Sequence, residues 1–287
     1  MKIKDLYKTK KSVVSFEIFP PKKEPDISTV YDTVEKLCDL SPDFISVTYS
    51  AGGSANRELT LDIAHDVKSR YKTESLAHLT CINSDKSEVL KMLNRAKELG
   101  IENILALRGD IPEDFCGKGD FRFAKDLIMQ IKRTHPEMCV GAAAYTEGHI
   151  ECDTTDENIE YLKEKADAGA EFFITQLFFD NRFFYEFYDL TIKKGLKIPI
   201  SAGIMPMLSK GQIERMIFMC GASLPAKIIR ILRKYEHSPE DLQKAAIEYS
   251  SEQINDLIAH KVDGVHIYTM NRPEIARANL ERMEKWI

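Results

Sequence analysis

The sequence has no hydrophobic run long enough to span a membrane, and its first residues are charged and lack the apolar segment of a secretory signal. It also has no long run of basic residues, and its formal net charge is −5. These absences argue against a membrane protein, and against a protein that binds nucleic acid or an anionic lipid surface through a basic face. We therefore expect a soluble, cytoplasmic protein.

Cysteine is scarce and scattered along the chain. The six cysteines are Cys38, Cys81, Cys116, Cys139, Cys152 and Cys220. None forms a C-x-x-C pair, and no cluster of histidine and cysteine has the spacing of a zinc site. The sequences GxGxxG and GxxxxGK, which bind nucleotide phosphates after a strand, are also missing. We expect mostly buried, reduced cysteines, no metal site, and neither of the two usual nucleotide loops.

The chain does contain a regular alternation of short apolar runs and amphipathic segments. The runs, typical of strands buried on both faces, are residues 13–19, 44–48, 76–81, 103–107, 140–145, 172–176, 198–202 and 264–268. The segments between them begin at capping residues such as Asp85 and end at glycines such as Gly100 and Gly169. Eight strands, each followed by helix, predict a single (β/α)8 barrel over residues 1–287. A doubly wound α/β sheet is the alternative.

Polar side chains recur where the predicted strands end. Glu17 lies among apolar residues near the end of the first strand, and the later strand ends carry Thr48, Tyr49, His78, Thr80, Arg108, Gly109, Asp110, Tyr145, Gln176, Tyr268 and Arg272. Each has an ordinary explanation: Glu17 could pair with Lys22, His78 could be a core histidine, and Arg108 could pair with Asp110. Their shared position favours an active site, because (β/α)8 enzymes place theirs at the C-terminal ends of the strands.

The residue types at these strand ends limit the chemistry. No lysine ends a core strand, which argues against a Schiff-base aldolase, and no acidic and histidine cluster has metal spacing. No Ser-His-Asp pattern appears. What remains suits the binding of a flat heteroaromatic cofactor and the donation of one proton. These groups are one acid among apolar residues, an Arg-Gly-Asp loop, an amide and several aromatic rings. Glu17 is the candidate donor, because burial favours the neutral form of a carboxyl group.

Motifs in a fixed order along the chain resemble those of the methylenetetrahydrofolate reductase family. They include SFEIFPPK at 15–22, HLTC at 78–81, ALRGD at 106–110, ITQLFFD at 174–180, GIMP at 203–206 and YTMNR at 268–272. The resemblance extends from residue 12 to residue 272. It implies a flavin-containing (β/α)8 barrel that reduces 5,10-methylenetetrahydrofolate to 5-methyltetrahydrofolate, within one-carbon metabolism and methionine biosynthesis.

The resemblance also implies roles for individual residues, with FAD as the cofactor and NADH or NADPH as the electron donor. Glu17 resembles the general acid that protonates the folate, Asp110 the carboxylate beside flavin and folate, and Gln176 the amide that orients the substrate. Further folate contacts implied in this way are Gln212, Met216 and Arg272. The implied FAD contacts are Thr48, Tyr49, Ala51, His78, Arg108, Gly109, Asp110, Ala124, Tyr145, His149, Asn158 and Lys165.

Some positions depart from the family pattern. Met216 stands where many relatives have a phenylalanine that contacts nicotinamide and folate, and Ala202-Gly203 stands where bacterial relatives often have Pro-Gly. Asn158, Tyr161 and Glu164 replace other polar residues of the FAD-contacting helix. Met216 leaves open an FAD-binding subunit of a larger redox complex, which would take electrons from a partner protein rather than directly from NAD(P)H.

Two further expectations concern alternatives and assembly. A flavin-free lyase or aldolase acting on a phosphorylated substrate is the rival enzymatic interpretation. The sequence lacks the C-terminal regulatory domain of eukaryotic relatives, so inhibition by S-adenosylmethionine is not expected. We expect a homo-oligomer, with a folate as the small-molecule partner and neither nucleic acid nor membrane as a partner.

Overall fold

The protein forms a closed barrel of eight parallel strands in chain order, in which the last strand pairs with the first. The computed structural model describes residues 1–21, 27–49, 53–111 and 119–283. The strands are β1 (Val13–Ile18), β2 (Phe44–Val47), β3 (Glu74–Thr80), β4 (Asn103–Leu107), β5 (Cys139–Ala144), β6 (Phe172–Thr175), β7 (Ile200–Ile204) and β8 (Gly264–Tyr268). The predicted (β/α)8 fold is confirmed.

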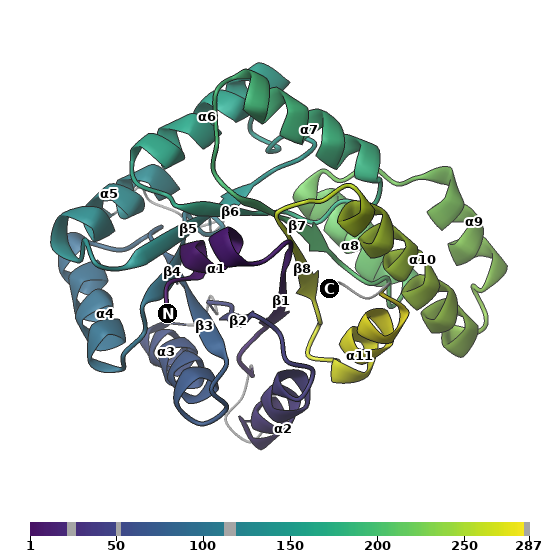
Figure 1. Ribbon diagram of the computed structural model, residues 1–287, viewed down its shortest axis with the longest axis horizontal. Helices are drawn as coiled ribbons and strands as arrows, with labels where there is room; N and C mark the ends of the chain where they lie inside the picture. Colours follow the sequence, from purple (N-terminus) through teal and green to yellow (C-terminus); the bar gives the residue numbers. More distant parts are fainter. Residues whose placement is uncertain (22–26, 50–52, 112–118, 284–287) are drawn as a thin grey trace.

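Helices surround the strands as an outer layer (Figure 1). They are α1 (Ile3–Thr9), α2 (Ile27–Cys38), α3 (Gly53–Ser69), α4 (Lys86–Glu98), α5 (Ala124–Thr134), α6 (Thr155–Asp167), α7 (Asn181–Lys193), α8 (Lys210–Cys220), α9 (Ala226–Lys234), α10 (Pro239–Ala259) and α11 (Pro273–Arg282). Asp85 caps α4 by accepting a hydrogen bond from the N–H of Glu88, as its position in the sequence predicts. No helix in the described part of the chain is both long and apolar enough to cross a membrane. The five cysteines among the described residues are free thiols.

The strand ends lie within two residues of those predicted. Strand β3 begins at Glu74 and not at residue 76. Strand β7 begins at Ile200 and not at residue 198. Pro199 has no N–H to donate to a neighbouring strand, although its carbonyl still accepts from the N–H of Phe173 at 2.8 Å. Helix α1 was not predicted at all.

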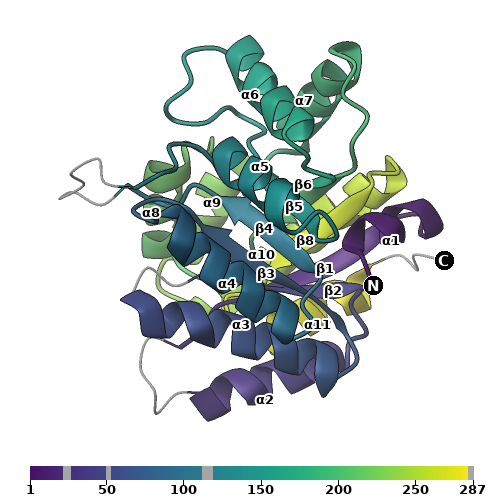
Figure 2. The ribbon, with the colours of Figure 1, turned by 90° about the vertical axis from the view of Figure 1, so that its left-hand side faces the viewer.

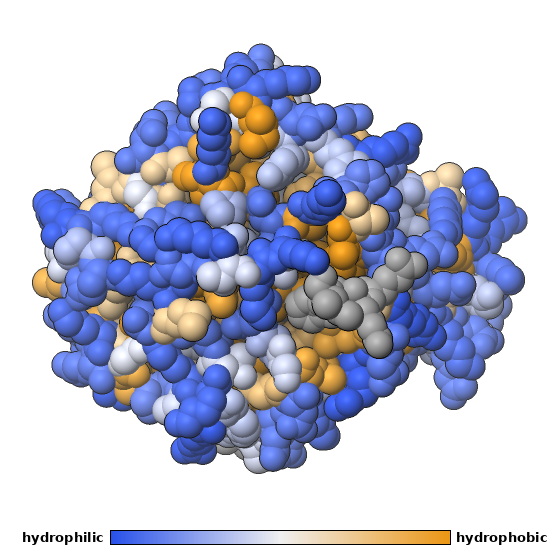
Figure 3. Space-filling view, viewed as in Figure 1, coloured by the Kyte–Doolittle hydropathy of each residue, from blue (hydrophilic) through white to orange (hydrophobic). Residues whose placement is uncertain are grey.

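Helix α1 closes the N-terminal end of the barrel. Ile3 and Leu6, both buried, pack against the inward side chains at the strand starts, among them Phe44 and Phe172. The N–H of Ile3 also donates to the side-chain oxygen of Asn103 at 2.8 Å. Figure 1 shows α1 in front of the strands, and Figure 3 shows that this face is largely hydrophilic. The base is thus sealed, and a site inside the barrel must open at the other end.

Side chains alternate between two environments along each strand. Outward residues such as Val14, Phe16 and Ile18 join the main core between barrel and helices. Inward residues form an apolar layer at the base, and above it lies a polar layer that includes Ser15, Ser46, His78 and His266, all buried. A further apolar cluster packs α8, α9 and α10 together, and α8 lies toward the end of the molecule opposite α1 (Figure 2).

Candidate active site at the C-terminal ends of the strands

Glu17 reaches into the barrel from β1 and meets three polar side chains of other strands. One carboxylate oxygen, Oε2, lies 3.4 Å from Ser46 Oγ, 3.5 Å from His266 Nε2 and 3.6 Å from His78 Nε2. The other ring nitrogen of His266, Nδ1, is 2.7 Å from Ser15 Oγ. The side chain of Glu17 is only 18% exposed. The carboxyl group therefore sits in a confined polar setting, and its polar contacts among the described residues are to one serine and two histidines.

The histidine on β3 is neutral. Burial lowers the pKa of His78 to about 4, and the nearby Glu17 carboxylate raises it by less. Its contact with Glu17 is therefore not an ion pair at neutral pH. The Nε2 atom of His78 is buried and forms no hydrogen bond with any residue that the structure describes. A buried polar atom of this kind needs a partner, and it lies where a ligand in the barrel would supply one.

The loop after β4 is organised by an arginine and a glycine. Arg108 donates from Nη1 and Nη2 to the two carboxylate oxygens of Glu151, at 2.6 and 2.9 Å. This contact raises the pKa of Arg108 and lowers that of Glu151. Gly109 has a φ of +88°, and a Cβ atom there would lie 3.0 Å from Thr80, so the turn requires glycine. Arg108 thus forms its ion pair with Glu151 and not with Asp110, two residues further along the same loop.

Four predicted FAD contacts meet beyond β5. The rings of Tyr145 and His149 meet edge to face, 4.7 Å apart. The amide of Asn158 donates to the carbonyl of Tyr145 at 2.8 Å, and Lys165 donates to the carbonyl of Ala143. Burial raises the pKa of Tyr145 to about 12 and lowers that of Lys165 to about 8. Lys165 is therefore not a solvated surface lysine.

The predicted folate contacts lie on β6, α8 and the start of α11. Gln176 follows β6, and its side-chain oxygen Oε1 accepts a hydrogen bond from the N–H of Leu177 at 2.8 Å. Gln212 accepts from the N–H of Leu208 at 2.8 Å, and Met216 packs against the cluster of α8–α10. These contacts fix one end of each amide side chain. The amide nitrogen of Gln212 also donates to Sδ of Met205 at 3.7 Å, whereas that of Gln176 forms no hydrogen bond with a described residue.

Arg272 is directed toward neighbouring helices. Its Nε donates to Glu274 at 2.7 Å and its Nη2 donates to Gln243 of α10 at 3.4 Å.

The remaining predicted FAD contacts lie on other elements. Thr48 follows β2, where its N–H donates to the carbonyl of Ile18 at 2.9 Å. The other predicted contacts are Tyr49, which packs at the edge of the main core, Ala124, the first residue of α5, and Ala51, which lies outside the described residues.

Of the residues around Glu17, the sequence singled out His78 but not His266, Ser15 or Ser46. His266 and the two serines are polar residues at inward positions of apolar strands, and Ser15 pairs with His266 in the β1–β8 register. The sequence Val265-His266-Ile267 contained a signal for this position, because a polar residue between two outward apolar residues of a strand points into the barrel. Glu151 was missed as well, because an acidic residue in a loop has no pattern that names its partner. No three His, Cys, Asp or Glu side chains in the described ranges are grouped as a metal site.

Comparisons with known sequences give one family. The family model described as "Methylenetetrahydrofolate reductase" matches residues 2–284. A relative from Escherichia coli, "5,10-methylenetetrahydrofolate reductase", is 32% identical over 265 residues, which are 92% of this chain and 88% of the relative. "Methylenetetrahydrofolate reductase 1" of Schizosaccharomyces pombe is 35% identical over 95% of this chain and 46% of its own length.

Coverage differs among these relatives. "Methylenetetrahydrofolate reductase (NADH) 1" of Arabidopsis thaliana is 32% identical over 94% of this chain and 48% of its own length. The chain therefore spans about half the length of the fungal and plant relatives. Among solved structures, an uncharacterized protein from Clostridium thermocellum, described as binding two copies of 5-methyl-5,6,7,8-tetrahydrofolic acid, aligns with a TM-score of 0.66 over 98% of this chain and 99% of that chain. At 15% identity this likeness shows the fold alone.

Proposed function

The chain belongs to the methylenetetrahydrofolate reductase family, and we propose that it reduces 5,10-methylenetetrahydrofolate to 5-methyltetrahydrofolate with FAD bound at the open end of the barrel. The observation that carries this proposal is the setting of Glu17. It is an acid inside the barrel with neutral His78 at 3.6 Å and with His266 and Ser46 about equally close. Such a group is suited to giving one proton to a bound substrate.

The residues present fit a flavin dinucleotide. His78 has a buried nitrogen in need of a partner, and Gly109 keeps the β4 loop free of a side chain. Arg108 and Lys165 would hold the diphosphate, for which guanidinium and ammonium groups are suitable partners. The remaining contacts that we propose for the cofactor are Thr48, Tyr49, Ala51, Asp110, Ala124, Tyr145, His149 and Asn158.

Bound FAD supplies the hydride that the folate accepts. The protein side chains do the rest of the chemistry. Glu17 gives its proton to the folate nitrogen that is released when the methylene bridge opens. Ser46 and His266 orient the carboxyl group by contacting Oε2. Gln176 orients the folate through its amide, and Gln212 and Arg272 add contacts.

Asp110 sets the electrostatics of the same region. It lies close enough to Arg108, Tyr145 and Cys220 to affect their pKa values. A carboxylate beside the flavin disfavours a second negative charge on the reduced ring system and so favours hydride release. Its charge is partly balanced by Arg108, which shares its loop.

Two electron donors are candidates for reducing the flavin. NADH is the first candidate, since the Arabidopsis thaliana relative carries that name. Met216 favours a second candidate, an FAD-binding subunit that takes electrons from a partner protein, because a thioether is a poorer platform for nicotinamide than an aromatic ring. Reduction of the flavin by NADH, NADPH and reduced protein carriers, assayed in turn, separates the two.

The first experiment asks whether the cofactor is present. We expect the purified protein to be yellow and to release FAD on denaturation. Colourless protein that cannot be reconstituted with FAD would contradict the proposal and favour a flavin-free lyase or aldolase.

The second experiment tests the acid. Glu17→Gln keeps the shape of the side chain but cannot give up a proton, so reoxidation of the flavin by methylenetetrahydrofolate should slow by about 10²-fold or more. Flavin reduction by the donor should be unchanged. Rapid-mixing absorbance of the flavin measures the two half-reactions separately. Glu214→Gln, at an exposed position of α8, is the matched control. If both half-reactions slow equally, Glu17 has a structural role and is not the acid.

A further inference from the structure

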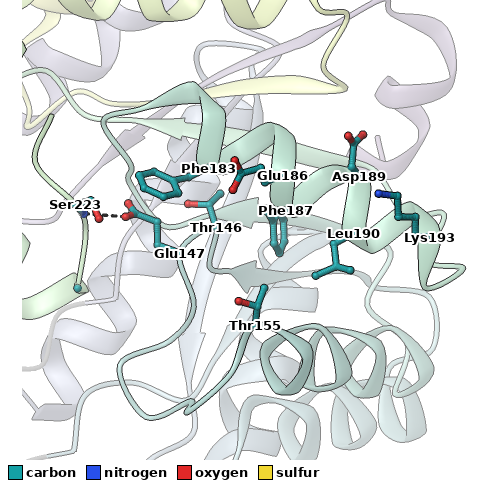
Figure 4. A pocket seen from close by; sticks show the side chains of 11 residues that line it. Thr146, Glu147, Thr155, Phe183, Glu186, Phe187, Asp189, Leu190, Lys193 and Ser223 are labelled. Atoms are coloured by element: carbon teal, nitrogen blue, oxygen red, sulfur yellow. Dashed lines mark hydrogen bonds between the residues drawn. The ribbon is translucent and has the colours of Figure 1, made fainter.

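A cavity lies beside α7, next to the loops at the open end of the barrel. It has a volume of about 630 Å³ and lies between α7, the start of α6, the β5–α6 loop and the loop after α8 (Figure 4). Phe183, Phe187 and Leu190 form its apolar part, and their spacing places them on one face of α7. None of the residues assigned above to flavin or folate lines it. The volume is in the range of small-molecule sites.

The charged residues of this cavity are mostly acidic. Glu147, Glu186 and Asp189 line it, against the single cation Lys193. Neither Glu186 nor Asp189 forms an ion pair with another residue in the described ranges, and both are exposed. The cavity therefore offers an apolar floor next to a negatively charged edge.

Glu147 adds a more specific requirement. Its Oε2 accepts a hydrogen bond from the N–H of Ser223 at 2.9 Å, which joins the β5–α6 loop to the loop after α8. Its Oε1 is buried and receives no hydrogen bond from the described part of the chain. A carboxylate oxygen without a donor is costly, and a nearby positive charge would reduce that cost.

The cavity borders the candidate active site but is lined by none of its proposed residues. Tyr145 and Gln176 line a smaller pocket that shares Thr146 and Glu147 with the cavity. The other lining residues belong to α7, to the start of α6 and to the loop after α8. A ligand that contacts the phenyl rings of α7 would therefore lie next to a ligand bound at Tyr145, and not in its place.

We propose that this cavity, the α7 cavity, binds an organic cation that carries an apolar or aromatic body. The phenyl rings accept the body and attract a cation at their faces, and the carboxylates balance its charge. Anions such as dinucleotide phosphates or the carboxylates of folate are disfavoured by the same three acids. Because Glu147 holds Ser223, an occupant also contacts the loop that ends α8.

The test uses the full-length, FAD-loaded protein and two probes of equal shape. Benzamidine is an aromatic amidinium that is charged at neutral pH, and benzamide is its neutral counterpart. We expect benzamidine to bind with a Kd of about 1 mM by calorimetry or ligand-observed NMR, as suits a fragment of this size. Benzamide should bind at least five times more weakly, and 0.5 M salt should weaken the binding of benzamidine only.

Charge-removing variants locate the site. The double variant Glu186→Gln/Asp189→Asn alters two exposed side chains, and should raise the Kd of benzamidine about fivefold or more. The matched control, Glu240→Gln/Glu248→Gln, removes the same charge from exposed positions of α10 and should leave the Kd unchanged. Phe183→Ala should weaken both probes, through lost apolar contact.

Each alternative result overturns the proposal. Absence of benzamidine binding at 10 mM, equal affinity for the two probes, or an equal effect of the α10 control would each do so. Because binding is measured directly, these outcomes are independent of whether the protein reduces methylenetetrahydrofolate.

Discussion

Lys165 is a residue that the fold holds at a cost. Its ammonium group is buried against the carbonyl of Ala143 and the ring of Tyr145, 5.7 Å from the ring centroid, and burial lowers its pKa from 10.5 to about 8. Below pH 8 the charged form is therefore destabilising. The cost disappears as the pH rises from about 8 to 10.5, since the folded state then releases its proton before the unfolded state does. An anion bound beside Lys165 would offset this cost.

Replacement of Lys165 should consequently stabilise the protein and weaken cofactor binding. A shift from 10.5 to about 8 corresponds to about 3 kcal/mol, and partial solvation reduces it. We expect Lys165→Met to raise the free energy of unfolding of flavin-free protein by about 1 to 3 kcal/mol at pH 7 and by much less at pH 10.5, in urea titrations. FAD should bind at least tenfold more weakly. Lys163→Met, on the same helix, controls for helix propensity; a destabilised Lys165→Met protein would contradict the argument.

The proposed acid was easier to predict than most of its neighbours. Glu17 was identifiable because a carboxylate in an apolar strand is expensive and because prolines end that strand. His266 and Ser15, which contact each other at 2.7 Å, come from opposite ends of the chain. Only closure of the barrel brings β8 beside β1, so no local pattern could have paired them. The partner of Arg108 was unpredictable for the same reason.

At the scale of elements, strand β7 depends on a close approach at Gly203. The carbonyl oxygen of Thr175 would lie 2.3 Å from a Cβ atom at Gly203, and the hydroxyl of Tyr268 2.9 Å from it. Tyr268 also donates to that carbonyl, at 2.7 Å. No flexible side chain can yield here, because the blocking atom belongs to the backbone.

Gly203→Ala should therefore cost about 3 kcal/mol or more, or prevent folding. Thermal unfolding and soluble yield measure this effect. Gly211→Ala is the matched control in α8, where an added Cβ meets no atom within 4 Å; it should stabilise the protein by about 0.5 to 1 kcal/mol. If both variants behave alike, steric contact at Gly203 is not the determinant.

Helix α8 carries a second prediction through Met216, which is partly buried against the α8–α10 cluster. If this side of the helix meets nicotinamide, Met216→Phe should lower the Kd of NADH or NADPH by about threefold to tenfold, because a ring stacks better than a thioether. Stopped-flow flavin reduction over a range of donor concentrations measures it. Met219→Phe, at a position that is 52% exposed, should have no effect. Unchanged kinetics with Met216→Phe would remove α8 from the donor site.

The elements that the sequence concealed are short or lack a pattern of their own. Helix α1 has seven residues and only two buried ones, Ile3 and Leu6. Two apolar positions cannot distinguish a helix from a charged tail. The eight strands were predictable because each is a continuous apolar run, and their ends lie within two residues of the predicted ones. Pro199 accounts for the shift at the start of β7.

For the whole molecule, the basal apolar layer and the proposed active site lie at opposite ends of the barrel. Ile3 is fully buried in the basal apolar layer, so Ile3→Ala should lower the free energy of unfolding by about 2 to 4 kcal/mol. The KM for the folate should be unchanged, because the substrate would bind at the far end. Urea unfolding and steady-state kinetics measure the two effects. Lys8→Ala, at a side chain that is 69% exposed, should change neither; a shift in KM with Ile3→Ala would mean that the two ends are coupled.

The ion pair between Arg108 and Glu151 has a consequence for how an anion would arrive. Both oxygens of Glu151 are engaged, and Glu151 belongs to the loop that also carries His149. A phosphate that pairs with Arg108 in the same way must displace the carboxylate of Glu151. Phosphate binding would then exchange one anion for another at the guanidinium group. The exchange would release the Glu151 end of the β5–α6 loop while the proposed contact of His149 with the cofactor holds the rest, so amide hydrogens around Glu151 should exchange with solvent faster just as the cofactor becomes fixed. Holding the ligand and loosening the loop would be a single event.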